Sequence, residues 1–129
     1  FFNDTATTET CTLWALAEGE VGGPRTVQTY VLVANTSAFA GRARVTLLFE
    51  DGTSLVQAYP LLPQSRTNAT IAEEFGAAVE GRRFGVLVEA LGATDGAPVP
   101  QLVVERAMYH DAGGVALAAG TNAKATKLR

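Results

Sequence analysis

The residue types that most often carry out chemistry are sparse in this sequence and form no catalytic pattern. His110 is the single histidine and Cys11 the single cysteine among 129 residues. A zinc or copper site would therefore consist mainly of carboxylates, which these metals seldom accept alone. None of the serines, Ser37, Ser54 and Ser65, lies in a G-x-S-x-G nucleophile elbow. We therefore predict no catalytic, metal or cofactor site, no bound cofactor, and a protein that is not an enzyme.

Two adjacent charges, Glu105 and Arg106, interrupt an otherwise apolar segment, residues 102–109. Successive side chains of a strand point to opposite faces, so the two charges lie on different faces, each among apolar neighbours. At least one of them is then partly buried and must be paired, because an unpaired buried charge is costly. We predict a structural ion pair involving Glu105 or Arg106 in preference to a binding site.

Three asparagines, Asn3, Asn35 and Asn68, each begin an N-x-[ST] sequon. This motif accepts a glycan on the surface of a secreted protein whose source has the glycosylation machinery. These residues are the candidate glycosylation positions.

Bulk composition excludes several classes of function. The chain is long enough for one domain with its own core, and its hydrophobic content of 47% is that of a folded protein. The net charge of −3 and the absence of a basic stripe argue against nucleic acid as a partner. No apolar run approaches the length of a membrane-spanning helix, so we predict no membrane span.

The clearest structural signal is a β-hairpin over Arg42 to Pro60. Every second residue from Ala43 to Phe49 is apolar, which predicts one buried and one solvent-facing side. Asp51-Gly52 supplies the turn residues that a tight hairpin requires, and the following segment returns as the partner strand. The hairpin indicates an antiparallel β protein.

Further short strands are predicted on both sides of this hairpin, separated by turn signals. Only residues 71–80 resemble a helix, and Gly76 limits that helix to one or two turns. Together these elements predict an all-β, two-sheet antiparallel β-sandwich of seven to eight strands, Ig-like in architecture. The predicted core comprises Val31, Val33, Val45, Leu47, Phe49, Ile71, Phe84, Val86, Val88 and Val104.

Several short phrases occur in an order that is typical of one domain family. They are residues 14–19 (WALAEG), 29–35 (TYVLVAN), 45–56, 63–67 (PQSRT), 103–109 (VVERAMY) and 120–123 (GTNA). In this order they resemble the Ig-like β-sandwich repeat domain of large secreted and cell-surface proteins of bacteria. The resemblance implies an extracellular or cell-surface location and a structural or adhesive role.

The first residues of the chain lie outside the part that resembles this repeat. We therefore divide the chain into an N-terminal extension, residues 1–13, and a β-sandwich domain, residues 14–129. The extension is rich in Thr and β-prone, so it is either an edge strand of its own sandwich or a donor strand for the next subunit. Phe1, Phe2, Ala6 and Leu13 are the candidate assembly anchors.

Two functions follow from this organisation. The first is a non-catalytic structural or adhesive subunit that joins copies of itself head to tail, or neighbouring domains, in a filament or surface layer. The alternative is a carbohydrate-binding module of a secreted protein, with surface glycans as partners. The exposed aromatic platform that this alternative requires would come from Trp14, Tyr30, Tyr59 or Tyr109.

Overall fold

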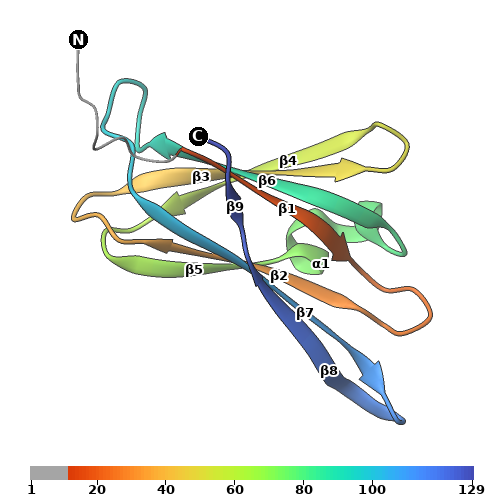
Figure 1. Cartoon of the computed structure of the whole chain (residues 1–129). Helices are drawn as coiled ribbons and strands as arrows, with labels where there is room; N and C mark the ends of the chain where they lie inside the picture. The colour runs from red at the N-terminus through yellow and green to blue at the C-terminus, as the bar shows by residue number, and fades with distance from the viewer. Residues whose placement is uncertain (1–11) are drawn as a thin grey trace.

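The computed structural model describes residues 12–129, apart from the side chains of residues 117 and 118, as two antiparallel sheets packed face to face (Figure 1). The five-stranded sheet has the order β4-β3-β6-β1-β9, and the four-stranded sheet has the order β5-β2-β7-β8. The prediction of an all-β, two-sheet antiparallel sandwich is confirmed. Residues 1–11, which include the candidate positions Phe1, Phe2, Asn3 and Ala6, lie outside the described part.

The described residues form nine strands, rather than the seven to eight predicted. They are β1 (Leu13–Glu20), β2 (Gln28–Asn35), β3 (Gly41–Phe49), β4 (Ser54–Leu61), β5 (Ser65–Thr70), β6 (Arg83–Gly92), β7 (Leu102–Ala112), β8 (Val115–Lys124) and β9 (Thr126–Lys127). The extra strand is β9, because at Ala125 the chain crosses from the four-stranded to the five-stranded sheet, where it pairs with β1. The predicted boundary between residues 13 and 14 falls inside β1.

The predicted hairpin is β3 and β4, which pair along their whole length. Gly52 has φ +86°, a left-handed conformation that glycine adopts without strain. The Asp51 carboxylate closes the turn by accepting hydrogen bonds from the Thr53 N–H (2.9 Å) and hydroxyl (2.6 Å). The sequence signal of alternation followed by Asp-Gly therefore identified both strands and the turn.

Within residues 12–129, one helical region connects β5 to β6 and lies against one side of the sandwich (Figure 1). It consists of α1 (Ile71–Phe75) and a 3₁₀ turn, η1 (Gly76–Val79). Gly76 ends α1 with φ +68°, as its position in the sequence suggested. Ile71 and Val79 anchor this region in the core.

The core lies between the two sheets and contains all ten residues predicted for it, which are 0 to 6% exposed. Phe49 and Phe84 meet edge to face, with ring centroids 6.1 Å apart. Trp14 is also buried here, at 1% exposed, because alternation along β1 turns it and Leu16 inward. Strands β1 to β7 all contribute buried side chains to this core.

Candidate interaction surfaces

The outer face of the four-stranded sheet carries apolar side chains across its middle. Alternation on β2 turns Val31 and Val33 into the core and leaves Leu32 and Ala34 on the outer face. On β7, Val103 lies beside Ala34 in the register and is 48% exposed. This sheet therefore carries apolar side chains on both faces, whereas an antiparallel sheet that faces water on one side normally has a polar outer face.

Two opposite charges flank this apolar strip. Arg66 on β5 lies opposite Ala34, and Glu105 on β7 lies opposite Leu32. With Leu32, Ala34 and Val103 they enclose a shallow hollow of about 170 Å³, and we call these five residues the outer patch. Among the described residues, the side chains of Arg66 and Glu105 form no ion pair and no hydrogen bond. The outer patch therefore presents an apolar floor between two unpaired charges of opposite sign.

Further along the same face, Tyr30 and Tyr109 form an aromatic pair. Their ring centroids are 5.8 Å apart in an edge-to-face arrangement. Tyr109 also lies across Gly120 of β8, where an added Cβ would come within 2.6 Å of its ring. Of the four aromatic residues predicted as a sugar platform, these two lie on an outer face, whereas Trp14 is in the core.

Tyr59, the fourth of these aromatic residues, points inward from β4 and is half-buried. Its hydroxyl is buried and has no hydrogen-bond partner among the described residues. Burial, with a smaller effect from the charge of Glu74, raises the pKa of Tyr59 to about 12. Tyr59 therefore offers no surface for stacking.

This raised pKa predicts how alkaline conditions affect stability. The folded protein holds the Tyr59 proton more tightly than the unfolded chain does. The contribution of this proton to the free energy of unfolding is therefore fully present below pH 10.0, the ordinary pKa of tyrosine, and is lost as the pH rises through about 12. We expect Tyr59→Phe to weaken this alkaline loss and to leave stability at neutral pH unchanged or slightly higher, because the hydroxyl lacks a partner. Urea unfolding of both proteins at neutral pH and across this alkaline range tests the prediction. Identical alkaline slopes would contradict it.

β8 is an edge strand whose outer side is open within residues 12–129. It pairs with β7 alone, and the β7–β8 hairpin extends beyond the other strands (Figure 1). Residues 115–123 contain no charged residue and no proline, and Val115 is 60% exposed. Such an edge is a template for pairing with another strand unless charge, proline, shortness or a bulge protects it.

The other edges carry such protection. β4 includes Pro60, and β5 has six residues with Arg66 among them. β9 has two residues and pairs only with the start of β1. The uncovered part of β1 contains Glu18 and Glu20, and its register shifts between Leu16 and Gly19. Among the described strands, β8 is thus the long edge without charge or proline from Val115 to Ala123, and the register shift in its pairing with β7 is confined to the hairpin end, between His110 and Ala112.

Arg106 is the buried member of the charged pair predicted from sequence. It points into the sandwich at 7% exposure and donates from Nη1 to the Glu18 carbonyl (3.1 Å) and from Nη2 to the Thr121 hydroxyl (3.2 Å). Its ion-pair partner is the Glu18 carboxylate, 3.6 Å away, and not Glu105, which lies on the outer face. Arg106 thus connects β7, β1 and β8 across the two sheets, a structural role.

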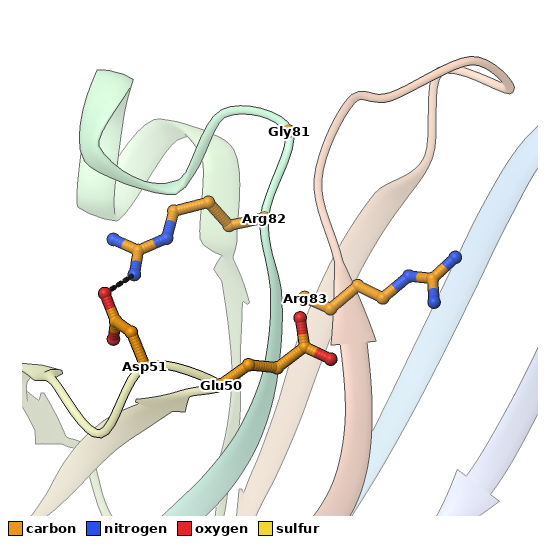
Figure 2. Close-up of a pocket in the computed structure, with 5 residues that line it drawn as sticks. All are labelled: Glu50, Asp51, Gly81, Arg82 and Arg83. Carbon is orange, nitrogen blue, oxygen red and sulfur yellow. Dashed lines mark hydrogen bonds and ion pairs between the residues drawn. The ribbon is translucent and has the colours of Figure 1, made fainter.

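A polar hollow of about 330 Å³ lies beside the β3–β4 turn (Figure 2). Figure 2 shows Arg82 and Asp51 turned toward each other, while Arg83 points away. The distance from Arg82 Nη2 to Asp51 Oδ2 is 3.2 Å. The Arg82 guanidinium also lies 3.7 Å from the centre of the Phe49 ring. Hydrogen bonds from Thr53, assisted by the charge of Arg82, lower the pKa of Asp51. Asp51 and Arg82 thus neutralise each other and stabilise the β3–β4 turn. We therefore assign the hollow a structural role and not a binding role.

The structure also places the remaining candidates. Asn35 is 2% exposed, and its amide group donates to the carbonyls of Phe39 (2.9 Å) and Leu62 (3.0 Å), so it cannot carry a glycan in the folded protein. Asn68 is exposed on β5. Leu13 is held in its own sheet, because its N–H donates to the Arg129 carbonyl (2.9 Å) and its carbonyl accepts from Leu128 (2.8 Å).

The described part of the chain contains no group of three or more His, Cys, Asp or Glu residues that could hold a metal ion. The half-buried His110 places Nδ1 2.9 Å from the neighbouring Asp111 carbonyl oxygen. No helix within residues 12–129 has the length and hydrophobicity needed to cross a membrane.

Fold and surfaces together define a β-sandwich domain with an open edge strand and an apolar outer face. No protein-family model matches the sequence, and no curated protein is significantly similar to it. Solved structures share the fold. A Thermotoga maritima protein, 1070, matches with a TM-score of 0.72 at 15% identity, over 93% of this chain and 97% of the other. The Anabaena sensory rhodopsin transducer matches with a TM-score of 0.59 at 14% identity, over 78% of this chain and 99% of the other.

Proposed function

We propose that this chain is a non-catalytic structural or adhesive subunit of an extracellular or cell-surface assembly, in which copies join head to tail by strand addition. The observation that carries the proposal is the β8 edge, which is nine residues long without charge or proline (residues 115–123). Main-chain hydrogen bonds along such an edge provide affinity, and alternate side chains of the added strand provide register. The resemblance to repeat domains of bacterial secreted proteins supports the extracellular setting.

The donor in this proposal is the N-terminal segment, residues 1–11. Thr12 and Leu13 are bonded into their own sheet through Arg129 and Ala90, so the donor ends before Thr12. Phe1, Phe2 and Ala6 remain as candidate anchors for the next subunit. A contact between two different surfaces of each copy continues indefinitely unless its rotation closes a ring, so it leads to a filament.

A matched pair of substitutions tests the β8 edge. We expect Val115→Lys to raise the protein concentration at which species larger than a dimer appear by at least about tenfold, because a charge on an edge strand opposes strand pairing. Val56→Lys is the control, since Val56 is also an exposed valine (54%) on an edge strand, β4, of the other sheet. Sedimentation velocity over a range of concentrations measures growth beyond small closed oligomers.

In the same measurement, deletion of residues 1–10 should abolish open-ended growth, because it removes the donor strand, while Val56→Lys should behave as the wild type. A wild-type protein that forms no species beyond a dimer at the highest concentration would overturn head-to-tail assembly.

Carbohydrate binding is the second candidate, and the Tyr30–Tyr109 pair favours it. These are aromatic rings on an outer face, which is where a sugar-stacking platform must lie. Against it, the ring of Tyr109 is already engaged by Tyr30 on one side and lies over Gly120. Assembly is therefore the function that the geometry supports better.

A further inference from the structure

The outer patch has a property that head-to-tail assembly does not use. Its floor of Leu32, Ala34 and Val103 separates a cation from an anion, Arg66 and Glu105, neither of which has a partner among the described residues. Arg66 on β5 lies directly across from Ala34 on β2. Glu105 lies on β7, two strands away from β5, across from Leu32, which is two residues from Ala34 along β2. From strand spacing and rise, their Cα atoms are roughly 12 Å apart.

We propose that the outer patch is a self-complementary interface, through which two copies of this chain pack face to face about a two-fold axis. An axis in the plane of the interface, midway between Arg66 and Glu105 and perpendicular to the line joining them, exchanges their positions. Arg66 of each copy then meets Glu105 of the other, and the apolar floors of the two copies cover each other. Both charges gain partners in one arrangement.

The opposite charges of Arg66 and Glu105 favour a second copy of this chain as the partner that covers the outer patch. A one-sign partner would satisfy one of the two charges and repel the other, whereas the same patch turned about a two-fold axis satisfies both. Lys124, the cross-strand neighbour of Glu105 on β8, forms no ion pair with it and lines a second hollow that shares only Val103 with the outer patch. The interface therefore pairs one cation with one anion twice.

This interface is separate from the β8 edge, so the two contacts give different assemblies. Strand addition extends a row of subunits, while the two-fold contact closes on itself as a dimer or joins two rows side by side. The full-length Val115→Lys variant, in which growth through β8 is suppressed, should then remain a concentration-dependent dimer.

Charge reversal in the Val115→Lys protein tests the pairing. Arg66→Glu creates a patch with two acidic residues, and Glu105→Arg creates one with two basic residues, so we expect each variant to be monomeric. Mixed in equal amounts, the two variants should form a heterodimer. In it the introduced glutamate faces the introduced arginine, and the unchanged Glu105 of one variant faces the unchanged Arg66 of the other. We expect at least about a tenfold difference in dissociation constant between the single variants and the mixture, measured by sedimentation equilibrium.

The controls are Arg25→Glu and Glu73→Arg, exposed residues outside the patch that change the net charge by the same amounts and should leave the dimer intact. Circular dichroism and thermal unfolding show whether each variant is folded. A monomeric Val115→Lys protein, or a dimer that survives both reversals, would overturn the two-fold interface without affecting strand addition. Conversely, wild-type protein that stops at the dimer would overturn strand addition and leave the two-fold interface standing.

Discussion

Replacing Arg106 by alanine is expected to lower the free energy of unfolding by about 3 kcal/mol or more. The side chain is buried and donates hydrogen bonds to the Glu18 carbonyl and the Thr121 hydroxyl, which lie on strands of different sheets. Truncation leaves a cavity between the sheets and removes both bonds, which are of the charge-assisted kind. Urea unfolding monitored by circular dichroism measures the loss.

The charge itself should contribute much less than the packing. The Glu18 side chain is 74% exposed, so solvent weakens its ion pair with Arg106. Glu18→Gln keeps the Glu18 carbonyl that accepts a hydrogen bond from Arg106, and should therefore cost less than Arg106→Ala. The Nε atom of Arg106 is buried without a hydrogen-bond partner among the described residues, and this lowers the stability of the native protein. Arg106→Met fills the same space without a charge and should therefore lose far less stability than Arg106→Ala.

Arg44→Ala provides the matched control for the arginine. Arg44 pairs with Glu89 on the exposed side of the five-stranded sheet, and removing such a pair costs under about 0.5 kcal/mol. Small and equal losses for Arg106→Ala and Arg44→Ala would show that the buried arginine does not hold the sheets together.

Patterns within one strand were enough to predict much of the fold. Alternation along β3 and β6 identified Val45, Leu47, Val86 and Val88 as core residues, because burial on one face of a strand depends on local spacing alone. The hairpin turn is equally local, since Asp51 and Gly52 set its conformation within a few residues.

Features that depend on the order of strands in the sheets could not be predicted in this way. Glu18, the partner of Arg106, is 88 residues away in the chain and is brought close only when the two sheets pack. The outer patch likewise requires β5, β2 and β7 to be neighbours, an order that no single segment encodes. The sequon at Asn35 is misleading for a related reason: the motif is local, whereas the burial of its amide depends on the loop carbonyls of Phe39 and Leu62.

The local signal for the burial of Trp14 was present in the sequence. Alternation in residues 13–17 turns Trp14 and Leu16 to one face and Leu13 and Ala15 to the other, as β1 shows. A large aromatic residue that shares one face of a strand with a second apolar residue, here Leu16, is typical of a core position. A sugar-stacking role for Trp14 is thus excluded by the same pattern that predicts the strand.

Trp14→Ala should accordingly cost about 3 to 5 kcal/mol, the range found for truncating a buried aromatic side chain. Trp14 is 1% exposed and reaches across the core to Leu102 and Val104 of the opposite sheet, so its loss opens a cavity between the sheets. Chemical unfolding of Trp14→Ala and Trp14→Phe measures the effect, and Trp14→Phe should retain most of the stability because it refills much of the space.

Because Trp14 is buried, glycan binding must be tested by substitution of Tyr109 and not of Trp14. Loss of glycan binding by Trp14→Ala would report unfolding, because the residue does not reach the surface. Tyr109→Ala removes a partly exposed ring from the outer face and should cost less than Trp14→Ala, about 1 to 2 kcal/mol, because only its contacts with Tyr30 and Gly120 are lost. A folded Tyr109→Ala protein that loses binding on a glycan array would establish the carbohydrate-binding function. If the wild type binds no glycan and Tyr109→Ala assembles normally, the aromatic pair serves only to cover Gly120.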